Sequence, residues 1–354
     1  MDPIKEALTY DDVLLAPKYS EILPSETKTE TKLSNNLSLK IPIISSAMDT
    51  VTESSMAIQI AKLGGIGVIH RNLKIKNQIL EIKKVKSKNL KVGAAVGAGP
   101  LEIKRAEALL KEKIDLIVVD TAHGHTKKVA EIVKKIKRLK SKKTTLCAGN
   151  VATIEAAKFL SKLGVDIIKV GIGPGSICTT RLVAGIGVPQ LSAILAAKKG
   201  IGKKKIRLIA DGGIKFSGDI SKALAAGADA VMIGSLFAGS NESPGKLIKK
   251  NGKYFKSFRG MGSIGAMNKG SADRYFQKKQ KDLSKYVPEG VEGLVKYKGP
   301  VEKIIYQLIG GLKSSMGYLG SKNIKDLRKK PKFVKITKAG FYESMVHNID
   351  QVLK

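Results

Sequence analysis

The sequence is poor in several residue types that define large classes of protein. Its 354 residues include no tryptophan and only two cysteines, and 5% of them are aromatic. Two cysteines, Cys147 and Cys178, cannot make the disulfide framework of a small secreted protein. No apolar run reaches the roughly 18–20 residues of a membrane span, and the first residues do not resemble a signal peptide. We therefore exclude the membrane, disulfide-scaffold and fibrous classes and expect a cytoplasmic globular protein.

Acidic residues are also scarce, since 30 Asp and Glu stand against 64 Lys and Arg and leave a net charge of +34. Such a charge is typical of proteins that bind nucleic acid. Only eight of the basic residues are arginine, however, so the sequence lacks both the arginine forks and the aromatic platforms that read bases. We interpret the excess as a lysine-rich solvated surface that attracts anionic small molecules. A nucleic-acid-binding barrel remains the alternative from another class.

Short apolar runs rich in β-branched residues recur along the chain, with amphipathic helical patterns between them. Such runs are typical of buried parallel strands. The eight predicted strands are Ile41–Met48, Gly65–His70, Val92–Gly97, Leu116–Ala122, Thr145–Asn150, Ile167–Gly173, Arg207–Ile214 and Ala230–Ser235. The helices predicted between them include Glu53–Leu63, Leu101–Lys111, Lys127–Leu139, Ile154–Leu163, Gln190–Lys198 and Ser217–Ala226. Eight strand–helix units predict an α/β protein, a (β/α)8 TIM barrel of about 250 residues.

Three stretches fall outside this repeat. Residues 237–300, after the eighth strand, form a long excursion rich in Gly, Lys and Ser, and such loops are usually lids or disordered segments. Residues 83–91 are a short lysine-rich connector between the second and third strands. A helix is predicted at Val301–Leu312, and a C-terminal tail at 323–354 carries a strand-like piece, Phe333–Ile336. We expect a single catalytic barrel over residues 1–354.

Chemistry in barrels of this kind collects where the strands end. Six predicted strand ends carry polar or glycine residues: Ser45–Asp49, Asp120–His123, Ala148–Asn150, Gly171–Cys178, Asp211–Gly213 and Gly234-Ser235. An apolar core has no need of such residues, so we predict a functional site at this face. The last two ends suggest a phosphate cradle. There Asp211 would hold ribose hydroxyls or, equally, cap the following helix.

Cysteine gives the sharper signal. Cys178 lies in a glycine-rich loop and is followed by Thr179-Thr180-Arg181, so its thiol is expected to be accessible and close to backbone donors and a cation, which favour the thiolate. Cys147 lies inside a predicted strand, where a cysteine is an inert small hydrophobe. We therefore favour Cys178 as a nucleophile and interpret Cys147 as a core residue.

The loop around Cys178 resembles a known family. Gly171-Ile172-Gly173-Pro174-Gly175-Ser176-Ile177-Cys178-Thr179-Thr180-Arg181 is similar to the catalytic loop of IMP dehydrogenase and GMP reductase, barrel enzymes that act at the purine 2 position. The likeness runs from Leu8–Leu15 to Glu343-Ser344. Three segments are closer to IMP dehydrogenase: Arg259–Ser263, which is similar to its loop, Asp273–Gln277, which is similar to its mobile flap, and Gly234–Gly239. The resemblance favours IMP dehydrogenase over GMP reductase.

The resemblance implies oxidation of IMP to XMP with NAD⁺ and water, the committed step of guanine nucleotide synthesis. The catalytic residues would be Cys178, Thr180, Arg274 and Tyr275. The Cys178 thiolate would attack purine C2, and hydride would leave for NAD⁺. Arg274 and Tyr275, helped by Thr180, would then activate the water that hydrolyses the thioimidate. An arginine base is chemically awkward because its pKa exceeds about 12, so a purely electrostatic role for Arg274 stays open.

The resemblance also assigns ligand contacts. For IMP these are Ser46, Met48, Ser176, Asp211, Gly213, Gly234, Ser235, Phe258, Gly260, Met261, Gly262 and Glu292, the last of them against the hypoxanthine ring. For NAD they are Asp120, Thr121, Asn150 and Gly171. Phe258 departs from the family, which usually has a tyrosine there that bonds the phosphate. That hydrogen bond to a charged group is worth roughly 1.5–3 kcal/mol.

A monovalent cation, K⁺, and an oligomer are implied as well. Carbonyl oxygens of Gly173, Gly175 and Cys178 would hold the ion, completed by Glu343, Ser344 and Met345 from a neighbouring subunit's tail. A shared site implies a closed oligomer, and this family forms homotetramers. Relatives usually carry a tandem CBS regulatory module between strands two and three, where residues 83–91 are too few for any domain. We therefore expect no control through such a module.

The alternatives make different predictions. A GMP reductase would release ammonia in an NADPH-dependent reaction without flap chemistry, against which Asp273-Arg274-Tyr275 argues. A nucleic-acid-binding barrel would give a salt-sensitive gel shift and no turnover. A flavin-dependent barrel is conceivable from the glycines of the phosphate cradle, and a colourless purified protein would dismiss it.

Overall fold

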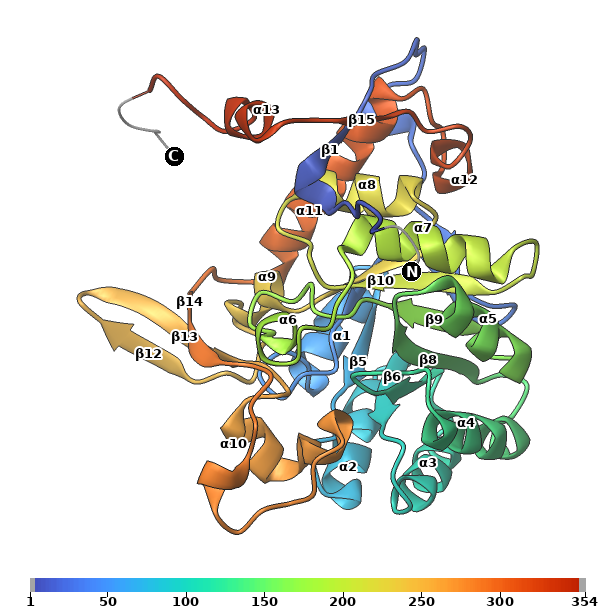
Figure 1. The fold of residues 1–354 in the computed structure, drawn as a ribbon, viewed down its shortest axis with the longest axis vertical. Coiled ribbons are helices and arrows are strands. Elements are labelled where there is room, and N and C mark those ends of the chain that lie inside the picture. The colour runs from blue at the N-terminus through green and yellow to red at the C-terminus, as the bar shows by residue number, and fades with distance from the viewer. Residues whose placement is uncertain (1–3, 350–354) are drawn as a thin grey trace.

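Eight parallel strands close into a barrel in the computed structural model, which describes residues 4–349 (Figure 1). In order they are β4 (Ile43–Ser45), β5 (Ile66–Ile69), β6 (Val92–Val96), β7 (Leu116–Asp120), β8 (Thr145–Val151), β9 (Ile167–Val170), β10 (Arg207–Asp211) and β11 (Ala230–Ile233). The last strand pairs with the first through Val231 and Ile43. Each strand overlaps one of the eight predicted runs, so the predicted (β/α)8 barrel is confirmed.

Helices follow the strands and cover the outside of the barrel (Figure 1). They are α1 (Ser54–Lys62), α2 (Ile75–Lys86), α3 (Glu102–Lys111), α4 (Lys127–Leu139), α5 (Ile154–Leu163), α7 (Gln190–Ile201), α8 (Ser217–Ala225) and α11 (Val301–Tyr318). Thr126 and Thr153 cap α4 and α5 by accepting backbone N–H groups, and Gly164 ends α5 at φ +75°. Helix α2 was not predicted from the sequence. Its last turn includes Lys83–Lys86, so the connector before β6 is shorter than predicted.

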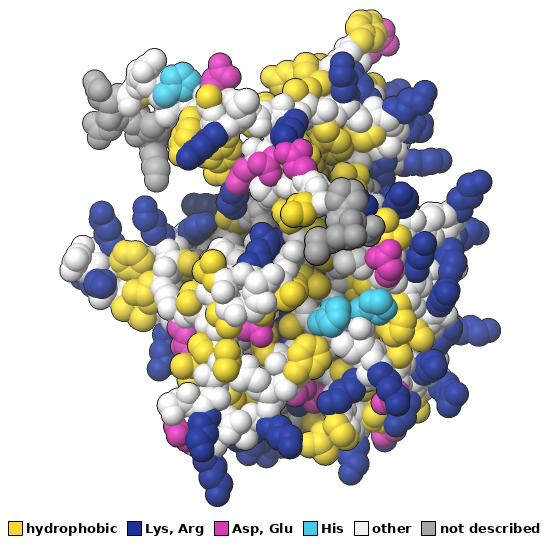
Figure 2. Space-filling model, in the orientation of Figure 1, with side chains coloured by type: hydrophobic (Ala, Val, Ile, Leu, Met, Phe, Trp, Pro, Cys, Tyr) yellow, Lys and Arg dark blue, Asp and Glu magenta, His cyan; other side chains and the backbone are white. Residues whose placement is uncertain are grey.

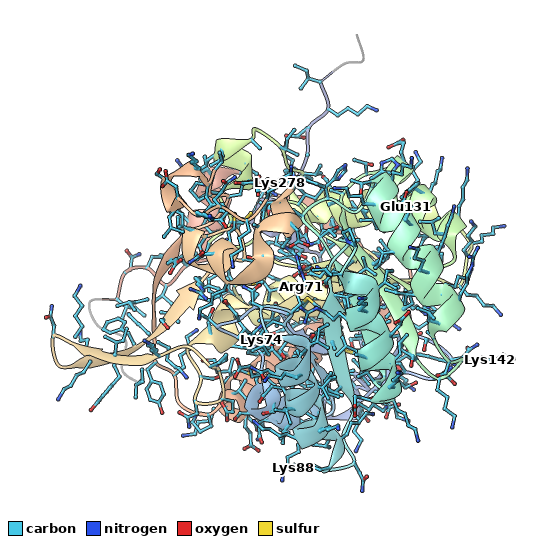
Figure 3. All side chains as sticks on the ribbon, turned by 90° about the horizontal axis from the view of Figure 1, so that it is seen from below. Arg71, Lys74, Lys88, Glu131, Lys142 and Lys278 are labelled. Carbon is cyan, nitrogen blue, oxygen red and sulfur yellow. The ribbon has the colours of Figure 1, made fainter. Side chains whose placement is uncertain are left out.

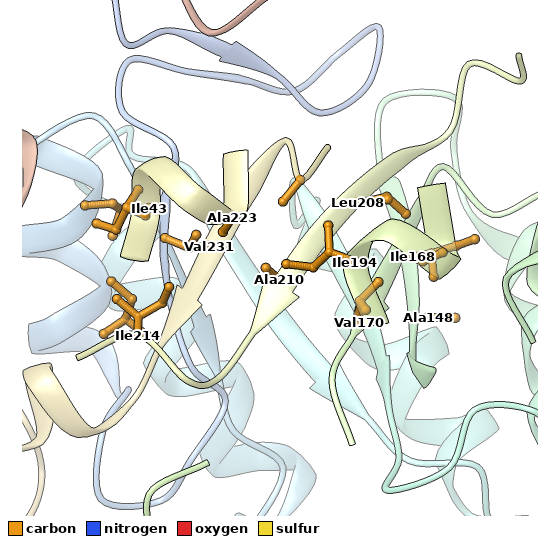
Figure 4. Packing of buried hydrophobic residues seen from close by; sticks show 14 of the residues in the cluster. Ile43, Ala148, Ile168, Val170, Ile194, Leu208, Ala210, Ile214, Ala223 and Val231 are labelled. Atoms are coloured by element: carbon orange, nitrogen blue, oxygen red, sulfur yellow. The ribbon is translucent and has the colours of Figure 1, made fainter. Parts of the chain in front are cut away.

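The core has two parts, because neighbouring residues of a strand face opposite sides of the sheet. On β10, Leu208 and Ala210 pack outward among the residues that meet the helices, together with Ile194 of α7 (Figure 4). Ile209, between them, belongs to a separate cluster with Val118 and Ile167 of other strands, which fills the barrel interior. This alternation decides which side chains of each strand can reach the axis of the barrel.

A small hairpin closes the end of the barrel at which the strands begin. It consists of β2 (Thr31–Lys32) and β3 (Ser38–Leu39), and Leu33, Leu37 and Leu39 join the interior cluster. The Thr31 hydroxyl donates to the carbonyl of Asp229 at 2.7 Å. With this end covered, only the carboxyl ends of the strands are left to form a site.

The excursion after β11 is more ordered than predicted. It begins with α9 (Ser235–Ala238) and carries an antiparallel sheet of β12 (Leu247–Lys250), β13 (Lys253–Arg259) and β14 (Glu292–Lys296), which projects from the barrel in Figure 1. Residues 260–291, which we call the flap segment, connect β13 to β14. They contain α10 (Ile264–Ala266), the π-helical turn η3 (Met267–Ser271) and the 3₁₀ turns η4 (Ala272–Tyr275) and η5 (Leu283–Lys285).

The segments before and after the barrel meet each other. The first contains the 3₁₀ turns η1 (Tyr10–Asp12) and η2 (Pro24–Glu26), and the last contains α12 (Ile324–Leu327) and α13 (Lys338–Glu343). β15 (Phe333–Lys335) pairs antiparallel with β1 (Val13–Leu15), and β15 coincides with the strand-like piece expected in the tail. Beyond it the chain extends away from the barrel (Figure 1).

The surface agrees with the lysine-rich composition. Figure 2 shows Lys and Arg side chains scattered over the visible face rather than gathered in one stripe. Within residues 4–349, no helix combines the length and apolar character needed to cross a bilayer.

Candidate active site

A cavity opens at the carboxyl ends of the barrel strands. Its lining includes the predicted residues Ser46, Met48, Asp120, Asn150, Gly171, Gly173, Gly175, Cys178, Thr180, Asp211, Gly260, Met261, Arg274 and Tyr275. A smaller neighbouring pocket shares part of this wall and adds Ser176, Gly213, Gly234, Ser235 and Phe258. The structure thus brings together most of the residues that the sequence analysis selected.

Cys178 lies in the loop between β9 and the short helix α6 (Thr180–Val183). Its Sγ is 3.2 Å from the Thr180 hydroxyl, and its backbone N–H donates to the Gly175 carbonyl at 3.1 Å. The loop is also bonded to the end of the flap segment, because the Thr179 N–H donates to the carbonyl of Glu289 at 3.0 Å. The half-buried thiol therefore sits on a loop that the flap segment helps to hold.

Cys147 is in a different environment. It is completely buried on β8 in the barrel interior. Burial raises the pKa of its thiol far above the ordinary value. A neutral, inaccessible thiol is a core residue, as the sequence analysis interpreted it.

The smaller pocket is built from the glycines that follow β10 and β11. Gly212 and Gly213 have φ values of +93° and +85°, which favour glycine. A Cβ on Gly234 would come within 3.1 Å of the Met48 sulfur, so the backbone runs close to the wall of the pocket. Phe258 is buried here and brings no hydroxyl group. Because glycines have no side chain to cover their backbone N–H groups, this pocket suits an anion better than the larger cavity does.

Lys169 is the principal residue that the sequence analysis missed. It lies two residues after Ile167 on β9 and therefore on the same face of the strand, so it points into the barrel. Its side chain is 2% exposed. Its Nζ lies 2.8 Å from Asp120 Oδ1 and 2.6 Å from Asp211 Oδ2, and it also donates to the Asn150 side chain. A single lysine inside the apolar run Ile167–Gly173 was the available signal, because a buried lysine needs partners of opposite charge.

The charges of this cluster fix its protonation. Burial would lower the pKa of Lys169, but the carboxylates of Asp120 and Asp211 outweigh it and raise the pKa above its ordinary value. Burial would likewise raise the pKa of Asp120, and the charges of Arg274 and Lys169 outweigh it, so the pKa lies well below its usual range. Lys169 and Asp120 are therefore both charged at neutral pH.

The flap segment places Arg274 and Tyr275 over this cluster. Arg274 forms an ion pair with Asp120, and its carbonyl accepts the Ala122 N–H at 3.3 Å. Despite burial, the Asp120 charge raises the pKa of Arg274 above its ordinary value. Burial raises the pKa of the Tyr275 hydroxyl, which therefore stays protonated. A charged donor and a neutral phenol thus face the cavity that holds Cys178.

Arg259 fixes the start of the flap segment. Its guanidinium makes two hydrogen bonds to Asp49, at 3.1 and 2.6 Å. These bonds raise the pKa of Arg259. Burial alone would raise the pKa of Asp49, but Arg259 outweighs burial and lowers it. The paired side chains hold Gly260 and Met261 against the cavity.

Some predicted residues do not line either pocket. Glu292 is exposed, accepts the Gly265 N–H at 2.8 Å and lies 3.9 Å from Arg259. The acidic residue from this part of the chain that lines the cavity is Glu289, three residues earlier. Thr121 is buried beside the cavity and donates to the Gly149 carbonyl at 2.7 Å. Gly262 is a neighbour of the lining, since a Cβ on it would come within 2.8 Å of the Tyr275 ring.

The predicted cation site is divided between two places. Gly173, Gly175 and Cys178 lie in the loop that lines the cavity. Glu343, Ser344 and Met345 lie in the exposed tail at the end of α13. No cluster of three or more His, Cys, Asp or Glu side chains suited to a metal occurs among residues 4–349.

This arrangement can carry out a defined chemistry. A thiol can form a covalent bond to an electrophilic carbon held in the cavity. Charge-balanced carboxylates at Asp120 and Asp211 can accept hydrogen bonds from two sets of sugar hydroxyls. The neighbouring glycine pocket can hold a phosphate group, and Arg274 and Tyr275 can polarise a water near the thiol.

Comparisons with known proteins agree with this chemistry. Residues 7–347 match the family model described as "IMP dehydrogenase / GMP reductase domain". Proteins named inosine-5'-monophosphate dehydrogenase from Cryptosporidium parvum and Borreliella burgdorferi are each 49% identical to the chain. The first alignment covers 99% of this chain and 97% of the relative, and the second covers 98% of each.

A more distant relative with the same name comes from Methanocaldococcus jannaschii. It is 39% identical over an alignment of 475 positions that covers 98% of this chain and 96% of the relative. Since the chain has 354 residues, at least 121 of those positions have no counterpart in it. That relative therefore contains chain that this protein lacks.

Proposed function

The chain belongs to the IMP dehydrogenase / GMP reductase family, and from that premise we propose that it is an NAD-dependent oxidoreductase that converts IMP to XMP in guanine nucleotide synthesis. The observation that carries the proposal is the position of Cys178 in one cavity with Asp120, Asp211, Arg274 and Tyr275. It combines a nucleophile, two sugar-binding carboxylates and a group that can direct water.

IMP binding is proposed at the glycine pocket and the adjoining wall of the cavity. Its phosphate would meet Ser176, Gly213, Gly234 and Ser235, and Asp211 would accept the ribose hydroxyls. Ser46, Met48, Gly260, Met261 and Gly262 would surround the base. For the carboxylate beside the hypoxanthine ring we favour Glu289 over the originally expected Glu292, because only Glu289 lines the cavity.

NAD would occupy the part of the cavity around Asp120, Thr121, Asn150 and Gly171. The residues fit such a group, because Asp120 is a buried carboxylate kept ionised by Lys169 and able to accept ribose hydroxyls. When bound, NAD⁺ supplies a hydride acceptor. In this structure the Asp120 carboxylate is paired with Arg274, so the flap segment must move away before the cofactor can bind to that carboxylate.

Cys178 is the proposed nucleophile. Its sulfur forms a bond to purine C2 while the π-electron pair of the C2=N3 bond moves to N3. The C2–H bond then breaks, its electron pair leaves as hydride and the C2=N3 bond re-forms, which yields a thioimidate on Cys178. A water molecule adds to C2, the S–C2 bond breaks and Cys178 recovers its electron pair as thiolate. The balance is IMP, NAD⁺ and water giving XMP, NADH and a proton.

Arg274, Tyr275 and Thr180 are proposed to direct that water. The Asp120 charge keeps Arg274 protonated in the present arrangement, so the guanidinium stabilises the developing hydroxide instead of accepting its proton. Tyr275 stays a neutral hydrogen-bond donor. The Thr180 hydroxyl, 3.2 Å from the Cys178 sulfur, lies closest to the bond that must be cleaved.

A K⁺ site and a homotetramer are part of the proposal. Neutral backbone carbonyls of Gly173, Gly175 and Cys178 are donors of the kind that suit a weakly hydrated monovalent cation. The exposed tail, with Glu343, Ser344 and Met345, extends away from its own barrel and is available to complete the site on a neighbouring subunit (Figure 1). We also propose a cytoplasmic enzyme without control through a CBS module.

Absorbance at 340 nm tests the proposal. Mixed with IMP and NAD⁺, the protein should give a rise that requires IMP and increases with K⁺. A rise that ignores K⁺ would remove the cation site alone. No rise, together with a fall in absorbance on adding GMP and NADPH, would identify a GMP reductase. Silence in both assays with a salt-sensitive shift of labelled RNA or DNA would favour the nucleic-acid-binding alternative.

A further inference from the structure

Two oppositely charged residues at the tip of the flap segment each meet a barrel residue of opposite charge. Arg274 pairs with Asp120 at the end of β7. The preceding residue, Asp273, accepts a hydrogen bond at 2.8 Å from Arg71, which follows β5. The flap segment supplies the acidic residue of one pair and the basic residue of the other. Together they fix both the position and the orientation of the tip.

Arg71 is buried although it carries a charge. Its side chain is 4% exposed, against 42% for that of Asp273. Figure 3 shows Arg71 in the interior beside the orange flap segment, whereas Lys88 and Lys142 lie at the periphery. Within residues 4–349, Asp273 is the carboxylate that pairs with Arg71, and the Arg71 Nε has no hydrogen-bond partner. A buried guanidinium depends strongly on its single counter-charge.

The barrel leaves room for this pair at Gly97, the residue after β6. A Cβ on Gly97 would lie 2.9 Å from the Cζ of Arg71 and 3.0 Å from the Oδ2 of Asp273. The first distance is shorter than carbon atoms adopt and the second is tight, so an alanine would require the ends of these two side chains to shift. The backbone of a third strand is therefore shaped around the contact between Arg71 and Asp273.

We propose that Arg71 is a positioning residue that acts through Asp273 to hold Arg274 and Tyr275 in the cavity. The proposal rests on the function given above. Arg274 and the cofactor compete for Asp120, so the flap segment must leave for hydride transfer and return for hydrolysis. Arg71 stabilises only the returned position. Its loss should slow hydrolysis, leave hydride transfer unchanged and make a second NAD⁺ a stronger inhibitor, since that NAD⁺ meets less competition from the flap.

Rapid-mixing and steady-state kinetics on the full chain test this. Arg71→Met should retain the first-turnover burst of NADH while kcat falls roughly five- to twentyfold, a size typical of coupling through one ion pair. The NAD⁺ concentration that halves the rate should fall by a similar factor. Arg71→Lys should restore most of kcat. Gly97→Ala should reproduce the Arg71→Met pattern with all charges retained.

A double-mutant cycle shows whether Asp273 transmits the effect. Asp273→Asn should behave like Arg71→Met, and the combined variant should be no worse than either. Arg328→Met is the matched control, because this half-buried arginine bonds to Asp229, Leu224 and Ala228, at the end of the barrel where the strands begin. It should leave the burst and NAD⁺ inhibition unchanged.

Each other result counts against a specific statement. Loss of the burst in Arg71→Met, additive losses in the double variant, or unchanged NAD⁺ inhibition would overturn the role of Arg71. A variant that failed to fold would be seen in its melting curve, and Gly97→Ala and Asp273→Asn would then decide. Absence of any NADH from the unmodified protein would instead overturn the proposed function.

Discussion

An apolar cluster inside the barrel includes Val118, Ile167 and Ile209, and we call it the apolar layer. Two residues further along the same three strands, Asp120, Lys169 and Asp211 form a charged cluster, which we call the charged layer. The first layer is apolar and belongs to the core. The second is a buried lysine between two carboxylates, covered by Arg274. Buried ion pairs are weak contributors to stability, so the second layer is explained by what it binds. Along each of these strands, two residues separate a side chain that stabilises the fold from one that serves the chemistry.

Replacing the nucleophile, which shares the cavity with the charged layer, should give the largest contrast with a substitution in the apolar layer. Cys178→Ala is expected to lower NADH formation by at least about a thousandfold, as removal of a covalent nucleophile does, while IMP binding and the melting temperature stay unchanged. Cys147→Ala, in the apolar layer, is the matched control and should keep its activity. Substantial turnover by Cys178→Ala would end its assignment as the nucleophile.

Lys169→Met should affect both properties at once. Removing the lysine leaves the buried carboxylate of Asp120 and the partly exposed carboxylate of Asp211 facing each other, and breaking a buried pair costs about 3–5 kcal/mol. KM for both IMP and NAD⁺ should rise, because Asp120 and Asp211 lose their shared counter-charge. Chemical denaturation and steady-state kinetics measure the two effects. A normal KM for either substrate would show that its carboxylate does not depend on Lys169.

Ile209→Ala should separate stability from activity. The side chain is completely buried two residues before Asp211, and its truncation is expected to cost about 2–5 kcal/mol of unfolding free energy. KM and kcat at 25 °C should stay close to the original values. A large change in kcat would mean that the apolar layer also sets the geometry of the site.

Phe258→Tyr should sharpen the phosphate end of the site. A hydroxyl group directed at a phosphate adds roughly 1.5–3 kcal/mol, so KM for IMP is expected to fall roughly ten- to a hundredfold. The KM for NAD⁺ serves as the internal control. An unchanged KM for IMP would place the phosphate out of reach of this side chain.

Acid should weaken the paired carboxylates selectively. The pKa values of Asp49 and Asp120 are lowered by Arg259 and by Arg274 with Lys169, respectively, against the effect of burial. Their contribution to stability is complete above the ordinary carboxyl pKa near 4 and is lost as pH falls through the lowered values. The melting temperature should therefore drop below about pH 4. Asp49→Asn should make this drop shallower; an identical pH profile would contradict the lowered pKa of Asp49.

The apolar layer was the part that the sequence predicted best. β-Branched runs of the barrel strands stand out because both faces of such strands are buried. β12 was missed because it is short, lysine-rich and exposed. β13 was missed because Lys256 occupies one of its two buried positions, so no apolar alternation marks the strand. α2 was missed for a similar reason, since lysines dominate its exposed face and Gln78 occupies a buried position.

The charged layer was predicted only in part. Asp120, Asn150 and Asp211 could be selected because each lies at or near the carboxyl end of a predicted strand. Lys169 lies near the start of the predicted strand Ile167–Gly173 and was absorbed into it. Glu289 and Glu292 lie three residues apart in similar sequence, and only the pairing of Val291 with Ile177 and Gly260 decides which one faces the cavity. Contacts between distant segments carry that information.

Because β1 pairs with β15, this small sheet can form only after the barrel strands have been synthesised. The eight barrel strands are all present once residue 233 has been made, but Val13–Leu15 has no partner until Phe333–Lys335 has left the ribosome. Until then the edge of β1 is open, and open strand edges invite pairing with other chains. A tag or truncation that disturbs residues 333–335 would leave a finished barrel with that edge exposed, and would show itself as aggregation of newly made protein before any loss of catalysis.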